Sequence, residues 1–572
     1  MVTMNLADFS NIVELLLYRA GVEPDTRAYT YLQADGQVGL TLTYGELDRQ
    51  ARAIAVRLQQ LAAPGERAIM LYGPGLEAVP AFFGCQYAGL IAVPIIPPRP
   101  NQSPAVFLNI LLDAGATLIL TSQRVYDLAQ AQYGSTAFFE AMRWVVTDTT
   151  ARTGSPEAWV AVKAQPRDPC MLLYTSGSTS APKGVVVTHA NVLGHARALL
   201  LLSEPFPGET IVTWAPLFHA AGLIGAVLQP LTLQFQMVAL SPLDVIEHPA
   251  RWLQAVSRYQ AAFSGSATFA YQMAVDRITP SEREGLDLSA WRYAFVGSEP
   301  IRADVLDRFA RTYAPYGFNP AAFYPAYGLS EATLLVTGRA KGRTASFRHF
   351  DGAALKQGRV APVEAGRAGA HTLVGCGHAL PEEKIRIIDT DTLAPCEPDR
   401  IGEVWVSSAR VAVGYWNKPE ATEATFRGFV AGTGEGPFLR TGDLGFLFED
   451  DLYIAGRLKE MIIVYGRNYY AQDIEAAAAG SHPHLGSAAA AFAVTRAGAE
   501  QIVIYHELKP DLDAPDIEAI SQAVRQAVAQ TLELPLHAVV LVEAGGLPRT
   551  PTGKLQRYQC REQFLDAQGQ AG

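Results

Sequence analysis

Short apolar runs that alternate with amphipathic segments are the feature that most restricts the fold of this chain. The runs "RAIMLYG", "ATLILTS", "CMLLYTSG", "TIVTWAP" and "YAFVGSEP" each lead into glycine, serine or proline. In the segment "TLTYGELDRQARAIAVRLQQL", Thr43 is placed as an N-cap with Glu46 three residues later, followed by apolar positions at helical spacing. This alternation predicts an α/β fold of layered sheets, with ligand-binding loops at the carboxyl ends of strands.

Length and composition restrict the class of protein. The chain has 572 residues, more than one hydrophobic core usually holds, so we expect two or more domains. A formal net charge of −10 argues against a nucleic-acid partner, because such surfaces carry clustered Lys and Arg. The five cysteines show no C-x-x-C spacing and indicate neither a disulfide framework nor a zinc site. The first residues lack a leader pattern and no apolar stretch approaches about 18 residues, so we expect a cytoplasmic protein without a transmembrane segment.

A stretch of small and hydroxyl-bearing residues with one lysine spans 172–192, "LLYTSGSTSAPKGVVVTHANV". Small residues let the backbone approach a ligand, and amides, hydroxyls and a cation can hold anionic oxygens. In the common nucleotide loop a Ser or Thr follows the lysine, whereas Gly184 follows Lys183 here. A polar surface loop is the alternative to a phosphate-binding loop. The predicted phosphate-binding residues are Thr175, Ser176, Gly177, Ser178, Thr179, Lys183 and Gly184.

Two segments interrupt the α/β pattern. Residues 338–371 are rich in Gly, Ala and Arg with few large apolar side chains, which predicts an insertion packed on the surface. Residues 448–468 place charged turns around a strand, and we locate a domain boundary there, at Leu458–Lys459. About a hundred residues follow, enough for a small α/β domain. The prediction is a large domain over 1–458 and a small domain over 459–572.

Four further motifs follow the loop in order along the chain. They are "YPAYGLSEATLLV" (324–336), "LRTGDLGF" (439–446), "GRLKEMIIVYGRN" (456–468) and "LPRTPTGKLQR" (547–557). Together with 172–192 they resemble the signatures of the adenylate-forming enzymes, which include acyl-CoA synthetases, luciferases and nonribosomal-peptide adenylation domains. The resemblance covers nearly the whole chain. It implies a large α/β domain with a β-rich subdomain, a small mobile C-terminal α/β domain, and activation of a carboxylic acid by ATP with Mg²⁺.

The resemblance implies roles for residues around the nucleotide. The loop would hold the β- and γ-phosphates of ATP, and Glu331 would bind Mg²⁺, a hard cation that takes oxygen ligands. Asp443 would accept the ribose hydroxyls, and Arg457 would contact ribose or phosphate. From the residues alone, Glu331 is equally compatible with a helix start, and Asp443 and Arg457 with a turn or a surface ion pair.

Adenine would lie against two further motifs. The resemblance implies that Tyr327 stacks on the base and that "VGSEP" forms the turn beside it; a core tyrosine is the alternative for Tyr327. The residues assigned to this part of the nucleotide site are Gly297, Ser298, Glu299, Tyr327, Gly328, Leu329 and Ser330.

Three residues are implied to act in the reaction or in domain movement. Lys554 would meet the charge that develops when a carboxylate attacks the α-phosphate and pyrophosphate leaves. His219 would line the acid-binding tunnel beside the reacting carboxylate, although Ala220 replaces the acidic residue of the family's H-D-x-G. A histidine satisfied on an apolar helix is the alternative. Lys459 would be the hinge of the small domain.

The branch most similar to this chain is the fatty acyl-AMP ligases. The stretches "AVPIIPPRP" and "LSPLDVIEHPARWLQAVSRYQAAFSGSATFAYQMAV", the insertion at 338–371 and "GRNYYAQDIE" resemble that branch, with Ala471 where proline is usual. The resemblance implies acyl transfer from acyl-AMP to the phosphopantetheine of a separate acyl carrier protein, in polyketide, lipopeptide or lipid biosynthesis. We expect a monomer or weak dimer. The alternatives are a fatty acyl-CoA synthetase, an amino-acid adenylation domain and a non-catalytic acyl- or nucleotide-binding regulator.

Overall fold

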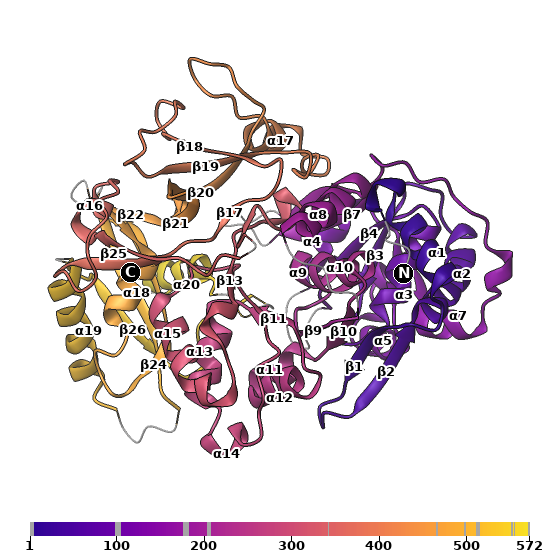
Figure 1. The fold of residues 1–572 in the computed structure, drawn as a ribbon, viewed down its shortest axis with the longest axis horizontal. Helices are drawn as coiled ribbons and strands as arrows, with labels where there is room; N and C mark the ends of the chain where they lie inside the picture. The colour runs from indigo at the N-terminus through magenta and orange to yellow at the C-terminus, as the bar shows by residue number, and fades with distance from the viewer. Residues whose placement is uncertain are drawn as a thin grey trace.

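A computed structural model describes residues 5–97, 104–175, 182–202, 208–340, 342–464, 467–496, 499–510, 515–532, 534–550, 553 and 555–569. The architecture is mixed α/β, as the alternation of apolar and amphipathic segments predicts. Figure 1 shows the N-terminal elements at one end of the long axis, the C-terminal helices and strands at the other, and a β-rich part lying over the space between them.

A six-stranded sheet carries the predicted phosphate loop at its edge. Its neighbouring strands are parallel except for the antiparallel pair β7–β8. Its order is β6-β5-β3-β4-β7-β8, with β3 (Arg67–Leu71), β4 (Ile91–Ile95), β5 (Leu118–Thr121), β6 (Arg143–Val146), β7 (Pro169–Thr175) and β8 (Lys183–Thr188).

A seven-stranded sheet forms the second layer of strands. It is parallel except where β2 returns antiparallel to β1. Its order is β13-β12-β11-β9-β10-β1-β2, with β1 (Arg27–Leu32), β2 (Val38–Thr43), β9 (Thr210–Thr213), β10 (Gln236–Ala239), β11 (Phe263–Ser266), β12 (Tyr293–Val296) and β13 (Phe323–Pro325).

Helices pack on these sheets, and one apolar core joins α2 and α3 to strands of both. The predicted capping box begins α2: Oγ1 of Thr43 accepts the Glu46 amide at 3.2 Å, and Glu46 accepts the Thr43 amide at 2.9 Å. The helices are α1 (Ile12–Val22), α2 (Tyr44–Gln59), α3 (Ala78–Tyr87), α4 (Ala105–Ala114), α5 (Gln123–Tyr133), α6 (Ala137–Ala141), α7 (Thr147–Thr153), α8 (His189–Leu202), α9 (Ala220–Gly222), α10 (Gln229–Leu233), α11 (Pro242–Glu247), α12 (Ala250–Arg258), α13 (Thr268–Arg277), α14 (Pro280–Arg283) and α15 (Ala303–Tyr313).

The β-rich part is built on a four-stranded antiparallel sheet. Its strands are β18 (Lys384–Ile388), β19 (Gly402–Ser407), β20 (Leu439–Phe448) and β21 (Asp451–Arg457), with α17 (Pro419–Phe426) nearby and β14 (Thr337–Gly338) paired to β17 (His378–Ala379). The segment 338–371 contains β15 (Phe347–Asp351) and α16 (Gly352–Lys356), and β15 pairs with β16 (Ala370–Val374). Most of this segment is exposed or half-buried, in line with surface packing, but Phe350 is fully buried against Phe446 and Tyr453.

The C-terminal residues form their own sheets and cores. The elements are β22 (Met461–Val464), β23 (Arg467–Tyr470), α18 (Ala471–Ala478), β24 (Leu485–Arg496), β25 (Ala499–Leu508), α19 (Ile517–Leu532), β26 (Ala538–Val542) and α20 (Arg557–Gly569). The 3₁₀ turn η7 (Leu458–Glu460) connects β21 to β22 and contains the predicted boundary, which stays a prediction. No helix in the described ranges has both the length and the apolar character to span a bilayer.

Candidate active site

A cavity of about 2870 Å³ gathers most of the predicted site residues that the structure describes. They come from both sheets, the β-rich part and η7, over more than 270 positions of sequence. Gly184 and Gly297 do not line the cavity but lie beside residues that do. The predicted residues on the wall are Lys183, His219, Ser298, Glu299, Tyr327, Gly328, Leu329, Ser330, Glu331, Asp443, Arg457 and Lys459.

The predicted phosphate loop connects two paired strands. Thr175 ends β7 and lies opposite Lys183, the first residue of β8. The predicted binding residues Ser176, Gly177, Ser178 and Thr179 lie outside the described part of the chain. Gly184 is explained by packing, because a Cβ there would lie 2.9 Å from the ring of Tyr174. Lys183 is therefore the described side chain that carries this motif's positive charge to the cavity.

Glu331 lies in the 3₁₀ turn η6 (Ser330–Ala332) and is held from one neighbouring segment. The Tyr415 hydroxyl donates to Oε1 of Glu331 at 2.9 Å, and the Ala412 amide donates to the Glu331 carbonyl at 2.8 Å. The ammonium of Lys183 lies 5.1 Å from the centre of the Tyr415 ring, within range of a cation–π contact. Burial raises the pKa of Glu331, although the residue is only half-buried by exposure; the hydrogen bond from Tyr415 opposes the rise.

A strained turn follows this carboxylate. Thr333 has φ 72° and ψ −57°, and the Leu334 amide donates to the Ala332 carbonyl at 2.9 Å, which makes a γ-turn. Such a conformation is costly for a β-branched residue. Two contacts hold it: Oγ1 of Thr333 donates to the Arg410 carbonyl at 2.6 Å, and Nε2 of buried His195 accepts the Leu335 amide at 3.1 Å.

Asp443 receives two side-chain donors. The Tyr327 hydroxyl donates to its Oδ2 at 2.7 Å, and Nε of Arg457, its cross-strand partner, donates to Oδ1 at 3.0 Å. Tyr327 is 8% exposed and packs in the main core, while its edge lines the cavity. Burial, and then the Asp443 charge, raise the pKa of Tyr327, so the phenol stays protonated and acts as a donor. Tyr327 is therefore a core tyrosine and at the same time part of the cavity wall.

The "VGSEP" turn lies at the end of β12. A Cβ on Gly297 would lie 2.6 Å from the Ala326 carbonyl. Only glycine therefore lets the turn pass so close to the backbone that precedes Tyr327. Ser298 has φ 68°, a left-handed conformation that is uncommon for serine. Glu299 accepts the amide of Phe269 at 2.7 Å and so joins the turn to the start of α13.

His219 caps a helix and does not lie within one. Its Nδ1 accepts the Ala221 amide at 3.2 Å at the N-cap of α9, and the π-helix η3 (Leu223–Leu228) follows. The alternative of a histidine on an apolar helix is therefore wrong in its placement. Apolar residues of the cavity wall include Phe218 and Ala220, which flank His219 in sequence, and also Ile246, Phe269 and Met273.

Lys554 lies outside the described residues, but its neighbours on both sides line the cavity. A Cβ on Gly553 would lie 3.0 Å from the ring of Phe269, so Gly553 lies against α13, whose Phe269 amide binds Glu299. Arg557 anchors the end of this loop, donating to Glu475 at 2.6 Å and 2.8 Å and to Glu460 at 2.9 Å. Glu460 is adjacent to Lys459, the predicted hinge.

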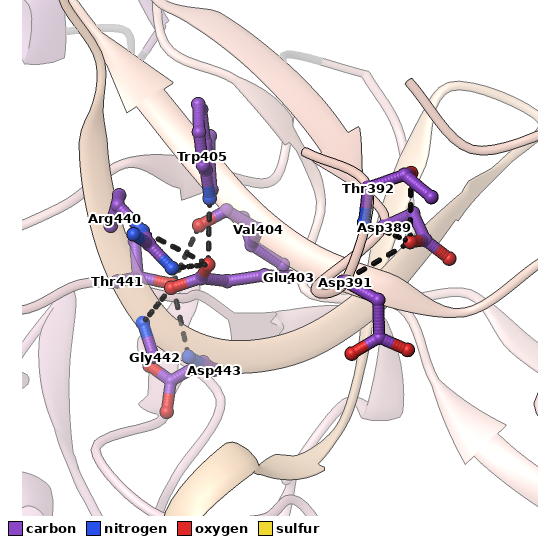
Figure 2. A network of polar contacts seen from close by, with 10 residues as sticks. All are labelled: Asp389, Asp391, Thr392, Glu403, Val404, Trp405, Arg440, Thr441, Gly442 and Asp443. Atoms are coloured by element: carbon purple, nitrogen blue, oxygen red, sulfur yellow. Dashed lines mark hydrogen bonds and ion pairs between the residues drawn. The ribbon is translucent and has the colours of Figure 1, made fainter. Parts of the chain in front are cut away.

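Two residues that we did not predict complete the site, Tyr415 and Glu403. Both come from "GEVWVSSARVAVGYW" (402–416), a stretch that contains a buried-strand pattern interrupted by one acidic residue. Figure 2 shows the Glu403 carboxylate next to the turn that carries Gly442 and Asp443. The sequence signal that could have identified Glu403 is an acidic residue within an apolar strand. Burial of an unpaired charge is unfavourable, so such a residue is expected to have polar partners.

Comparisons with known proteins identify the family of this chain. A family model for AMP-binding enzymes matches residues 17–416. JamA of Moorena producens, a medium-chain-fatty-acid–[acyl-carrier-protein] ligase, is 40% identical over 98% of this chain and 96% of its own length. The long-chain-fatty-acid–AMP ligase FadD26 of Mycobacterium marinum is 34% identical over 97% of each chain. A fatty acyl-adenylate ligase from L. pneumophila, solved in complex with acyl adenylate and pyrophosphate, is 35% identical with a TM-score of 0.77 over 98% of this chain and 97% of that one. The chain therefore belongs to the AMP-binding enzyme family, and its relatives there are fatty-acid ligases.

Proposed function

We propose that this enzyme activates a medium- or long-chain fatty acid with ATP, forming acyl-adenylate and pyrophosphate. It then transfers the acyl group to the phosphopantetheine thiol of a separate acyl carrier protein. The names of the similar enzymes support the fatty acid, the adenylate and the carrier protein.

The observation that carries the proposal is the meeting of ionic and apolar walls in one cavity. Lys183, Glu331 and Asp443 contribute charges from three separate parts of the chain. The apolar wall near His219 provides a surface for an alkyl chain, whose burial is favourable at about 25 cal/mol per Å². A carboxylate at the junction of these walls would face the α-phosphate of ATP.

The residues present fit a Mg²⁺ that arrives with ATP. In the described part of the chain no group of three or more His, Cys, Asp or Glu side chains could hold a metal ion. Mg²⁺ is commonly held by one or two carboxylates together with substrate phosphates. Glu331 suits that arrangement, because Tyr415 occupies one oxygen and a carboxylate has several acceptor positions. Bound there, Mg²⁺ would neutralise phosphate charge.

In the proposed reaction a fatty-acid carboxylate oxygen attacks the α-phosphorus. A new P–O bond forms, and the bond to the bridging oxygen of pyrophosphate breaks. Residues 175–184 hold the leaving pyrophosphate, Asp443 and Arg457 hold the ribose side, and Tyr327 and the 297–299 turn border adenine. Lys554 meets the negative charge that develops at the reacting centre. His219 would border the attacking carboxylate.

Acyl transfer to free CoA would require rearrangement of the small domain about Lys459. Contacts between that domain and the segment 338–371 would oppose this movement. His371 of this segment lies 3.8 Å from Asp473 on α18, and the ammonium of Lys356 lies 5.8 Å from the centre of the Tyr469 ring. Such contacts would disfavour use of free CoA relative to a carrier-bound thiol.

The test is incubation with ATP, Mg²⁺ and fatty acids of increasing length, with holo-acyl carrier protein or CoA as acceptor. Fatty-acid-dependent ATP–pyrophosphate exchange, with acylated carrier detected by intact-protein mass spectrometry, is expected. Stoichiometric acyl-CoA would instead identify a fatty acyl-CoA synthetase. Absence of exchange with every acid would favour the non-catalytic regulator. A cytoplasmic location and a monomeric or weakly dimeric state stay predictions.

A further inference from the structure

The ladder between β19 and β20 is interrupted where Asp443 leaves it. Glu403 lies opposite Leu444, but Trp405 lies opposite Arg440. Val404 alone therefore faces residues 441–443, which form a bulge in β20. A bulge re-aims side chains and removes ladder partners from backbone groups. The direction of the Asp443 carboxylate depends on how this bulge is held.

The carboxylate of Glu403 supplies the partner of one backbone amide in the bulge. It is 2% exposed, and its Oε1 accepts the Gly442 amide at 3.0 Å. Its Oε2 accepts Nε1–H of Trp405 at 2.8 Å and lies 3.4 Å from the Arg440 guanidinium. Figure 2 shows these donors converging on the one carboxylate from the two strands.

Thr441 supplies the second partner from within the bulge. Its Oγ1 donates to the Val404 carbonyl at 2.7 Å and accepts the Asp443 amide at 3.1 Å. Gly442 has φ 70°, the left-handed region that favours glycine. The backbone amides of Gly442 and Asp443 are thus both held by side-chain oxygens in place of ladder carbonyls.

We propose that Glu403 is a positioning residue for ribose recognition, holding the 441–443 bulge in the form that aims Asp443 at the nucleoside. The proposal rests on the proposed function only through the role of Asp443 at the ribose of ATP. Arg457 and Tyr327 hold the Asp443 side chain, whereas Glu403 holds the backbone that carries it.

The chemistry of the site requires a carboxylate and not an amide. Gly442, Trp405 and Arg440 all present donors, and an ionised carboxylate is acceptor-only. In Glu403→Gln the amide nitrogen must face one of these donors, whichever way the side chain turns. The contact with Gly442 or the contact with Arg440 and Trp405 is then lost, while side-chain volume is nearly unchanged.

The test is calorimetric binding of ATP and of 2′,3′-dideoxy-ATP, which lacks both ribose hydroxyls, without any fatty acid. The wild type is expected to prefer ATP by about tenfold or more, since hydrogen bonds to charged groups have that effect on an equilibrium constant. In Glu403→Gln we expect this preference to fall at least threefold, with dideoxy-ATP binding nearly unchanged. Thr441→Val removes the other side-chain oxygen that holds the bulge and should have the same effect. This second variant tests the proposal even if Glu403→Gln does not fold.

The matched control is Asp389→Asn, a residue drawn in Figure 2 near the same sheet. Oδ1 of Asp389 accepts the amides of Asp391 and Thr392 at 3.1 Å and 2.8 Å, so its contacts stay within its own turn. Its preference for ATP should equal that of the wild type. Equal weakening of both nucleotides in Glu403→Gln, or an unchanged preference in both bulge variants, would overturn the proposal. A wild type that binds ATP and dideoxy-ATP equally would also overturn the proposal. The proposed function would not be affected by that result, because fatty-acid-dependent exchange tests it separately.

Discussion

The phenolic hydroxyl of Tyr415 donates a 2.9 Å hydrogen bond to Oε1 of Glu331, the carboxylate that we assign to Mg²⁺. The backbone around Tyr415 also reaches the strand of Lys183, because the Trp416 amide donates to the Gly184 carbonyl at 2.8 Å. One segment therefore contacts both charged residues that border the proposed phosphate site. Burial raises the pKa of Tyr415 far above its ordinary value, so it remains a donor at all working pH values.

Tyr415→Phe should raise the Mg²⁺ concentration needed for half-maximal pyrophosphate exchange by about fivefold to fiftyfold. The change removes the donor to Glu331 and keeps the ring beneath Lys183, and loss of one partner to a charged group has about this effect. Titration of exchange with Mg²⁺ is the measurement. Tyr453→Phe is the control, since it loses a hydroxyl contact with Ser346 and neither residue lines the cavity. An unchanged Mg²⁺ requirement would contradict the role of Tyr415.

Glu331→Gln should reduce exchange at least a hundredfold while leaving thermal stability equal or higher. Burial raises the folded-state pKa of Glu331 above the unfolded value, so the native state binds the proton more tightly. Its contribution to stability is then greatest at low pH and falls as pH rises through the two pKa values. Replacing the carboxylate removes this penalty, and Gln still accepts from Tyr415. Melting temperatures at pH 5 and pH 8 test it; a marked drop at pH 8 would contradict the prediction.

Lys554→Ala should lower the rate of acyl-adenylate formation by about 10² to 10³, with little change in ATP binding. The expected size follows from loss of one charged group aimed at developing negative charge. Single-turnover measurement of adenylate separates this step from nucleotide binding. Lys163→Ala, an exposed lysine outside every motif, is the control. Full activity of Lys554→Ala would remove the lysine from the reaction.

Disrupting His371–Asp473 should increase acyl-CoA formation about twofold to fivefold, because the contact joins segment 338–371 to α18. The modest size reflects the partial exposure of the pair. The variants are His371→Ala and Asp473→Asn, measured with saturating CoA. Arg348→Ala is the control, since its ion pair with Glu449 at 2.7 Å joins β15 only to the turn after β20. Equal CoA use in all variants would argue against a restraint by these residues.

Acidification should destabilise the turn that follows Glu331. Burial, and then the Arg410 charge, lower the pKa of His195 to about 3. The unfolded chain therefore binds this proton first, and stability falls as pH decreases from about 6.5, by roughly 2 kcal/mol at pH 5. His195→Gln should show a shallower loss between pH 7 and pH 5 in thermal melts. An unchanged pH slope would contradict the assignment.

Much of the fold follows from local pattern. The Thr43–Glu46 capping box and the strands ending at Thr175 and Val296 form where the apolar runs and capping residues predict them. These features depend on neighbours within a few positions, which sequence shows directly. The burial of Phe350 has the opposite origin: this aromatic residue, in a segment rich in Gly and Ala, is buried by strands that come about a hundred positions later.

The sequence by itself determined the layered α/β class, the order of the motifs and the residues that they contain, because those depend on periodicity and residue type. Only the tertiary structure decided which residues support the motifs. Tyr415 reaches Glu331 through bonds between residues 412–416, β8 and η6, and Glu403 reaches the Asp443 turn through a bulge between β19 and β20. Strand register across long separations sets these contacts, and a shift of one residue would send each side chain to the other face of its strand.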